Sequence, residues 1–486
     1  DLTLGQAGGT LTFTGGVSAT SPSLVTINGS ILTDGGDADF TGGTIEVAGT
    51  SIIDTEQGDN GAAGAVVLGG SVSSSGGAAV DLTINTATAA LGLSGGDITL
   101  GTFDSGGGDP IRNLYLVTTG DAGDGVVTSA SAVVLTGLLS VDLDSSSATL
   151  TAGGTDLSTL QVLSGYDITV DEAGGIEVLT STITNDLSIT STGPVTVSGT
   201  ISSGGGSVSI TTSGMLTINN DITAGTGAQV DLNGTGITIA STADTTITGS
   251  GGIQTDSGTG TLTLGSASFT GTLTNSGSAA SIDLTGDDLN IHTANGTIST
   301  GIGNLVIIPS TVSQTTSLGT GSTGLGLSAA ELNRITTSGE LFIGDGTITG
   351  SISSDGAINL SSGGLSGPVT LQNANGGITL NHAVTVPADL TISTVGTLSL
   401  GASGDVIASG PVQFTATAGI STAGDVTTDA LGATVDYVSA VTLTGDVTVD
   451  TTGGAAPGSG ITFGGTIDGA FALDLTAGTG TVDVAG

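Results

Sequence analysis

The sequence contains no cysteine and no tryptophan, and aromatic residues make up only 2% of its 486 residues. Without cysteine no disulfide can form, so stability has to come from a packed core. Lysine is also absent, and the only basic residues are Arg112 and Arg334. Against 43 acidic residues they leave a net charge of −41. Binding of nucleic acid depends on basic residues that displace counterions, so the composition excludes nucleic acid as a partner.

The residues that favour helices are also scarce. Only six of the acids are Glu and the other 37 are Asp, while Gly occupies 88 positions. Asp, Gly, Ser and Thr favour turns and strands, whereas Glu and Lys favour helix surfaces. No apolar run approaches the ~18 residues of a membrane span, so we expect no membrane insertion. The hydrophobic content of 36% argues against a disordered chain.

Short apolar groups recur at a regular interval in the middle of the chain. The groups have apolar residues at positions i and i+2, which is the period of a strand with one buried face. Leu187/Ile189, Val195/Val197 and Ile201 return 21 positions later as Val208/Ile210, Leu216/Ile218 and Ile222. Similar sets follow from Val369 to Ile420, at shifts of 20 to 22 residues.

This repeat predicts an all-β fold, a right-handed parallel β-helix with three strands in each ~21-residue coil. The chain would then hold roughly 23 such coils, in a single continuous solenoid over residues 1–486. Since it begins at Asp1 and strand-like residues reach both ends, we expect it to be a segment of a longer chain.

One stretch, residues 327–344, interrupts the repeat. Ser328 and Glu331 have the spacing of a capping box, and the residues between them favour helix, so we expect a short helical turn near residues 328–335. Glu331 and Arg334 are also spaced to form an ion pair. Strand character resumes at Leu341-Phe342-Ile343-Gly344.

The same stretch, with Glu331-Leu332-Asn333-Arg334-Ile335 followed by Leu341-Phe342-Ile343-Gly344, resembles a unit that recurs in filamentous-haemagglutinin-like bacterial exoproteins. The coils around it, which are rich in Thr, Gly and Asp, are also similar to the coils of those proteins. The resemblance implies a right-handed β-helix that is exported to the cell surface and acts as an adhesin or stalk. It supplies no catalytic residues, and the secretion domain of that family is not recognisable here.

Aspartates gather in Gly-rich turns and are weak candidates for Ca²⁺ ligands, because hard cations take several oxygen ligands. The candidates are Asp34, Asp37, Asp39, Asp121 and Asp124. The alternative is that they are solvated turn residues, which we favour because tandem Gly-Gly-x-Gly-x-Asp repeats are missing. We therefore expect no obligatory cofactor, with Ca²⁺ as the possible exception.

Signals for catalysis are weak. His292 and His382 lie 90 positions apart, about four coils, and cannot share a site. Gly92-Leu93-Ser94-Gly95-Gly96 fits the hydrolase pattern G-x-S-x-G but lacks its strand-to-helix context. A glycan-acting β-helix hydrolase or lyase with paired carboxylates is the alternative function. A Thr-rich ice-binding face is not expected, because the Thr positions do not keep register from coil to coil in the sequence.

The prediction is therefore a non-enzymatic, secreted structural or adhesive rod of a large bacterial surface protein. Its partners would be other copies or neighbouring segments of the same protein, neutral glycans, or proteins of a host or cell surface. Acidic polysaccharides and anionic membranes would be repelled by its charge.

Overall fold

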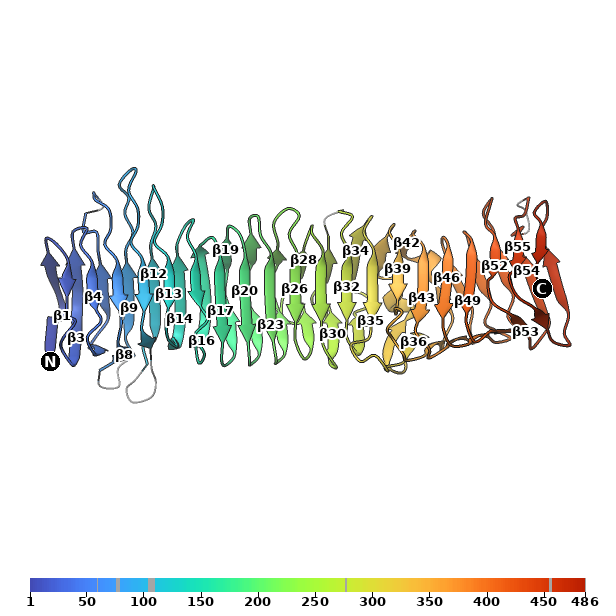
Figure 1. Cartoon of the computed structure of the whole chain (residues 1–486), viewed down its shortest axis with the longest axis horizontal. Coiled ribbons are helices and arrows are strands. Elements are labelled where there is room, and N and C mark those ends of the chain that lie inside the picture. The colour runs from blue at the N-terminus through green and yellow to red at the C-terminus, as the bar shows by residue number, and fades with distance from the viewer. Residues whose placement is uncertain (59, 76–78, 104–109, 276–277, 454–456, 486) are drawn as a thin grey trace. The chain divides into compact units, whose positions relative to one another are not determined.

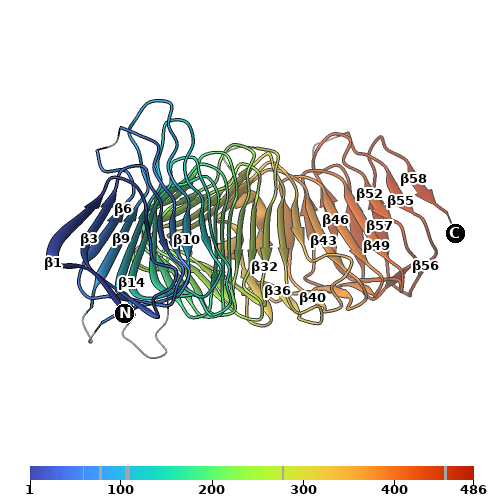
Figure 2. The same ribbon diagram turned by 60° about the vertical axis from the view of Figure 1, so that its left-hand side comes forward.

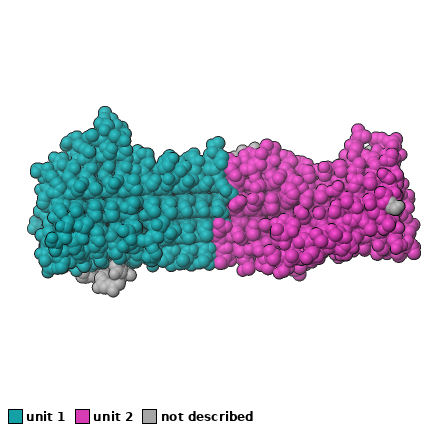
Figure 3. All heavy atoms as spheres, viewed as in Figure 1, with its two compact units in different colours: residues 1–232 teal, residues 233–486 magenta. Residues whose placement is uncertain are grey.

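A computed structural model describes residues 1–58, 60–75, 79–103, 110–275, 278–453 and 457–485 of the chain. The chain divides into two compact units, residues 1–232 and 233–486 (Figure 3). Each unit is a parallel β-solenoid, and the two together hold about 20 coils. Within the described residues no helix has both the length and the apolar character needed to cross a lipid bilayer.

Unit 1 is built from three sets of strands, one for each side of a coil (Figure 1). The first face contains β2 (Val17–Ser18), β4 (Ala38–Phe40), β7 (Val66–Leu68), β10 (Ile98–Leu100), β13 (Val127–Ser129), β15 (Ala148–Leu150), β17 (Ile168–Glu172), β20 (Leu187–Ser191) and β23 (Val208–Thr212). The second contains β5 (Thr44–Val47), β8 (Ser71–Ser74), β11 (Thr102–Phe103), β18 (Ile176–Val178), β21 (Val195–Val197) and β24 (Leu216–Ile218). The third contains β6 (Ser51–Asp54), β9 (Asp81–Asn85), β12 (Asn113–Val117), β19 (Ser181–Ile183), β22 (Ile201–Ser203) and β25 (Ile222–Thr223).

Four long strands serve two sides of a coil at once. These are β1 (Leu2–Phe13), β3 (Leu24–Thr33), β14 (Val134–Asp142) and β16 (Asp156–Ser164). The first half of β3 pairs with β5 and its second half pairs with β6. The three-strand coil is therefore the usual form but not the form of every coil. The boundary between the two units falls within β26 (Val230–Asn233).

Unit 2 follows the same plan (Figure 2). Its first face contains β29 (Ile253–Asp256), β32 (Ile282–Thr285), β35 (Leu305–Ile308), β39 (Leu341–Ile343), β43 (Val369–Asn373), β46 (Leu390–Thr394), β49 (Val412–Ala416), β52 (Val435–Tyr437), β55 (Ile461–Phe463) and β58 (Val482–Val484). Two further sheets contain β27 (Ile237–Ile239), β30 (Thr261–Leu264) and β33 (Asp288–Ile291), and β28 (Thr245–Thr248), β31 (Gly271–Thr274), β34 (Gly296–Gly301), β38 (Ile335–Thr337) and β42 (Gly364–Leu365).

The remaining coils of unit 2 are completed by two more sheets. One contains β36 (Thr316–Gly319), β37 (Leu325–Ser328), β40 (Ile352–Ser354), β44 (Ile378–Leu380), β47 (Leu398–Leu400), β50 (Ile420–Thr422), β53 (Val441–Leu443) and β56 (Ile467–Asp468). The other contains β41 (Ile358–Asn359), β45 (Val384–Val386), β48 (Val406–Ala408), β51 (Val426–Thr428), β54 (Val447–Asp450) and β57 (Leu473–Thr476). The helical pieces are α1 (Ala329–Leu332) and the 3-10 turn η1 (Leu360–Ser362).

The predicted 21-residue register is confirmed where the sequence signal was clearest. Leu187 pairs with Val208, and on the next side of the coil Val195 pairs with Leu216. All four side chains are buried, so equivalent aliphatic residues stack in columns inside the coil. Each buried aliphatic side chain contributes about 1.5–3 kcal/mol before the entropy of ordering is subtracted.

The predicted uniform coil length is wrong outside these stretches. Val66 pairs with Ile98, 32 positions on, and Leu305 pairs with Leu341, 36 positions on. The second of these coils contains β36, β37, α1 and β38, so part of its extra length is regular structure. Because these coils are longer than 21 residues, the chain makes about 20 coils and not the 23 expected. Whether they form one continuous solenoid stays a prediction.

Candidate functional site

The corner before the first face contains a column of polar side chains that join successive coils of unit 1. Asp167, Asp186 and Ser207 precede β17, β20 and β23. The N–H of Leu187 donates to the Ser207 carbonyl (3.0 Å), in the direction of the next coil. The N–H of Ser207 faces the previous coil and donates to Asp186 Oδ1 (2.7 Å), and the N–H of Asp186 donates to Asp167 Oδ1 (3.2 Å). A short acidic side chain thus supplies the acceptor that the corner backbone needs.

Of the Ca²⁺ candidates in the first Asp-rich turn, Asp37 lies in the same kind of corner, directly before β4, and Asp39 lies within β4. Asp37 Oδ1 accepts the N–H of Ala65 (2.8 Å), one coil on, and Asp39 Oδ1 accepts the N–H of Thr41 (3.1 Å). Asp34 is exposed and forms an isolated antiparallel bridge with Glu56. The side chains of Asp37 and Asp39 therefore accept backbone N–H groups, whereas Asp34 lies beside another acid, Glu56.

The other two Ca²⁺ candidates lie in projecting loops of unit 1, visible at one edge of the blue strands in Figure 1. Asp121 Oδ2 accepts the N–H of Gly92 (2.7 Å) in the preceding loop. Asp124 accepts the N–H groups of Gly120 (2.6 Å) and Ser145 (2.7 Å). The Asp121–Gly92 contact joins two of these loops, and the N–H of Ala63 donates to the Ser94 carbonyl (3.2 Å), which joins a third. We call residues 56–58, 60–64, 87–96 and 119–125 the loop cluster. It is the part of unit 1 where the coils are longest.

No group of three or more His, Asp or Glu side chains in the described ranges has the arrangement of a metal site. Bound Ca²⁺ on the five candidate aspartates therefore remains a prediction. Their observed hydrogen bonds show that most of them also have a structural role, which the sequence pattern did not distinguish.

Glu172, at the end of β17, is an acid that the sequence reasoning missed. It is only 2% exposed, and its two carboxylate oxygens accept the N–H groups of Leu157 and Gly174, both at 2.8 Å. Burial raises the pKa of the Glu172 carboxyl to about 7, while the two N–H donors oppose this shift and the neighbouring Asp156 adds to it. A shallow cavity of about 160 Å³ is lined by Glu172, Gly153, Gly154 and Thr190 among others.

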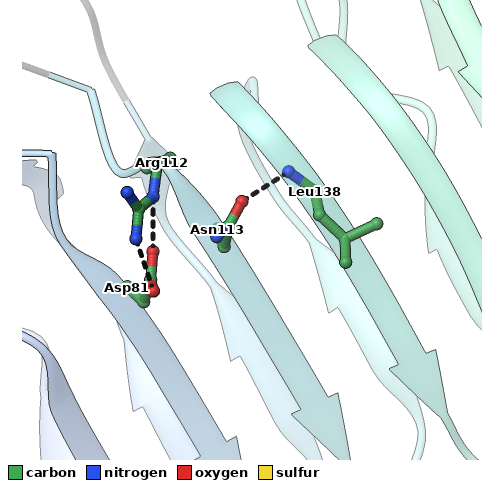
Figure 4. Close-up of polar contacts among 4 residues, drawn as sticks. All are labelled: Asp81, Arg112, Asn113 and Leu138. Carbon is green, nitrogen blue, oxygen red and sulfur yellow. Dashed lines mark hydrogen bonds and ion pairs between the residues drawn. The ribbon is translucent and has the colours of Figure 1, made fainter.

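A second group of polar contacts joins the start of β9 and β12 to the middle of β14 (Figure 4). The Arg112 guanidinium makes two contacts to Asp81, with Nε 2.9 Å from Oδ1 and one terminal nitrogen 2.8 Å from Oδ2. Beside it, Asn113 Oδ1 accepts the N–H of Leu138 (2.8 Å), where β14 changes its register to the next coil. The contact between Arg112 and Asp81 is the one ion pair found in the described part of the chain.

The helical turn predicted near residues 328–335 is confirmed. Ser328 is the N-cap of α1: its hydroxyl accepts the N–H of Glu331, and Glu331 Oε2 accepts the N–H of Ser328 (2.8 Å). The predicted Glu331–Arg334 ion pair is wrong. Glu331 Oε1 instead accepts the N–H of Ile291 (3.1 Å), and Arg334 donates to the Gly296 carbonyl (2.7 Å) and the Thr297 hydroxyl (3.0 Å). Both side chains tie the turn to the preceding coils, a contact that spacing within the segment does not reveal.

The histidines and the G-x-S-x-G segment lie in turns, as expected. His292 Nδ1 accepts the N–H of Asn295 (3.1 Å), and the backbone N–H of His382 donates to the Ser354 hydroxyl (2.9 Å). Ser94 forms an isolated parallel bridge with Gly123 inside the loop cluster. The His292 contact is local to its turn, whereas the other two join successive coils.

Thr residues do keep register on one face of unit 2, which corrects the expectation from the sequence. Thr246, Thr272 and Thr297 form one column over β28, β31 and β34. Thr248 and Thr274 form a second, which continues into Ser299. The register was hidden because these coils differ in length, so the columns do not recur at a constant spacing in the sequence.

Glu56 is a second functional candidate that sequence reasoning missed. It is 1% exposed, and one of its carboxylate oxygens has no hydrogen-bond partner. A signal for it and for Glu172 was present: both are among only six glutamates in a chain of 37 aspartates, and both directly end or follow a strand. A longer acid in place of the usual Asp, Ser or Thr reaches further into the corner.

Comparison of the chain with protein-family models, with curated proteins and with solved structures finds no match. The class of protein is thus defined by its own architecture: a β-solenoid repeat protein.

Proposed function

We propose that the chain is a structural and adhesive rod of a large, secreted bacterial surface protein. The observation that carries this proposal is the parallel pairing of successive coils, such as β17 with β20 and β20 with β23, over buried aliphatic columns. Each added coil extends a solenoid by about 4.8 Å and needs no new kind of contact. Such a design favours length and rigidity.

The outward side chains support a role in presentation and adhesion. On the first face of unit 1, Thr169, Ser188 and Ser209 point outward in register between buried neighbours. Hydroxyl groups with scattered carboxylates suit neutral glycans or protein surfaces, whereas the net charge of −41 disfavours anionic partners. The loop cluster is the best candidate for the adhesive element, because loops on a rigid scaffold commonly carry binding residues.

The resemblance of residues 327–344 to haemagglutinin-like exoproteins supports the same proposal, since the segment forms a capped helical turn followed by a strand of the first face. Export to the cell surface and association with other copies or neighbouring segments belong to the proposal. Immunogold electron microscopy of the source cells tests the location. Label on surface fibres supports the proposal, and label confined to the cell interior would contradict it.

Adhesion is tested with a matched pair of variants. Leu91 in the loop cluster is 88% exposed, and Leu431 in a turn of unit 2 is 81% exposed. We expect Leu91→Ser to weaken binding to cell surfaces or neutral glycan arrays, and Leu431→Ser to leave it unchanged. If the wild-type chain binds neither surface, the adhesive part of the proposal is wrong and the structural part stands alone.

A glycan-acting hydrolase is the second candidate, and Glu172 is the observation that favours it. A carboxyl whose pKa is raised to about 7 can act as a general acid, and Asp156 is a nearby second carboxylate. Its burial and its two backbone N–H donors fit a structural role better. Hydrolysis of a polysaccharide by the wild-type chain, abolished in Glu172→Gln, would overturn the non-enzymatic proposal.

A further inference from the structure

Glu56 is a buried carboxylate without a basic neighbour. It follows β6 and is 1% exposed. Arg112, the one basic residue of unit 1, is paired with Asp81. A buried carboxylate oxygen is costly when it has neither a hydrogen bond nor a charged partner, so an unpartnered oxygen of Glu56 favours binding of a cation from solution.

One oxygen of the Glu56 carboxylate is already occupied by hydrogen bonds. Oε1 accepts the N–H groups of Asn60 (2.9 Å) and Gly61 (2.7 Å). Oε2, in contrast, is buried and has no hydrogen-bond partner in the structure. The second oxygen is therefore left for a positively charged ligand.

An open space beside Oε2 also borders a backbone carbonyl oxygen. The point where Gly35 would carry a Cβ is 3.5 Å from Glu56 Oε2 and 2.9 Å from the Ala62 carbonyl oxygen. Gly35 has φ +73°, a conformation that disfavours any side chain, so this space stays open. Asp34 is bridged to Glu56 in an antiparallel pair, which places the two side chains on the same side of the backbone.

We propose that Glu56 Oε2, the Ala62 carbonyl and the Asp34 carboxylate form a binding site for a hard divalent cation such as Ca²⁺. These are carboxylate and carbonyl oxygens, the ligands that Ca²⁺ takes, with water completing the shell. The site would hold the first loop of the loop cluster against β3. The inference is independent of the proposed adhesive function, because it concerns only this corner of unit 1.

Hydrogen exchange of the whole chain with Ca²⁺ or EDTA, at pH 7 and matched ionic strength, tests the site locally. The peptide that covers residues 53–66 contains the two N–H groups bound to Oε1. We expect saturating Ca²⁺ to slow its exchange at least tenfold and to raise the Tm by several degrees. Peptides of unit 2 should change little, which separates the site from general screening of 43 acids.

The variants make the result specific. Glu56→Gln should abolish the Ca²⁺ effect, and Asp34→Asn, at an exposed position, should weaken it about tenfold without affecting the fold. Glu172→Gln is the matched control, because both oxygens of that buried acid already have N–H donors. The proposal is overturned if the 53–66 peptide does not respond to Ca²⁺, or if the response persists in Glu56→Gln.

Discussion

The rings of Tyr437 and Phe463 stack face to face on neighbouring coils, with centroids 4.8 Å apart and planes only 6° from parallel. Phe414 continues the column on the other side of Tyr437, with centroids 5.1 Å apart. The three residues are register partners on β49, β52 and β55 and are fully buried. The spacing of the rings is therefore that of the coils, and the aromatic column replaces the usual aliphatic one.

The Tyr437 hydroxyl is buried without a hydrogen-bond partner, so we expect Tyr437→Phe to stabilise unit 2. An unsatisfied buried polar group costs about 1–3 kcal/mol, and removing the hydroxyl keeps the ring stack intact. Burial also raises the pKa of the Tyr437 phenol, so it should stay protonated in the folded chain. Urea denaturation followed by circular dichroism measures the gain. Tyr437→Ala is the control and should lose about 3–5 kcal/mol, because it leaves a cavity. A destabilised Phe variant would reveal a partner for the hydroxyl.

Glu172 should make the stability of unit 1 depend on pH near neutrality. Its pKa is raised from the ordinary value of 4.5 to about 7 in the folded chain. The folded state therefore binds the proton more tightly than the unfolded state, and the stabilisation is complete below pH 4.5 and lost as pH rises through 7. We expect the Tm of the wild type to fall by several degrees more than that of Glu172→Gln between pH 4.5 and 8. Glu177→Gln, at an exposed position on the next strand, should behave like the wild type. Parallel Tm curves for wild type and Glu172→Gln would contradict the raised pKa.

The sequence predicted the coils best where successive coils have the same length. The column from Leu187 to Val208 was found because both residues belong to 21-residue coils with apolar residues at i and i+2. The coils from Val66 to Ile98 and from Leu305 to Leu341 were not recognised, because their extra residues break the 21-residue spacing of the apolar groups. The free energy of closing a coil depends only weakly on loop length, so the fold tolerates long insertions that the sequence periodicity does not reveal.

Contacts between coils explain the remaining errors. Arg334 reaches Gly296, 38 positions away, in preference to Glu331 on its own turn. Asp186 was not singled out in the sequence, although it binds the N–H of Ser207 on the next coil. Glu56 and Glu172 were missed for the same reason: their chemistry depends on backbone groups that the solenoid brings beside them. Such pairs are fixed by register, and register is known only after the coil lengths are known.

Asp355 should hold the turn that follows β36 in place above acidic pH. Burial alone would raise the pKa of Asp355, but hydrogen bonds from the hydroxyl and N–H groups of Ser322 and Thr320 lower it well below its ordinary value of 3.8. The contribution to stability is therefore present above pH 3.8 and lost as pH falls through the lower pKa of the folded state. We expect Asp355→Ala to speed hydrogen exchange of residues 319–324 severalfold at pH 7, with a smaller difference in acid. Asp474→Ala, which removes the same charge at an exposed position, is the control. Equal exchange in both variants would show that the turn does not depend on Asp355.

Asn113 should matter more for stability than its charged neighbour Arg112, although Arg112 forms the ion pair. The guanidinium of Arg112 is solvent-exposed, and exposed pairs are weakened by water and salt, so Arg112→Ala should change the Tm little. Asn113 Oδ1 instead accepts the N–H of Leu138 at the irregular point of β14, where the strand ladder offers no carbonyl. Asn113→Ala should cost about 1–3 kcal/mol, because that N–H loses its acceptor. Asn113→Asp keeps an acceptor oxygen and should recover most of the loss, which a purely steric role would not predict. The same denaturation series at low and high salt completes the test. Salt should change the stability difference between Arg112→Ala and the wild type, and it should leave the loss of stability in Asn113→Ala unchanged. A larger loss of stability in Arg112→Ala than in Asn113→Ala would show that the ion pair is the main contact between these coils.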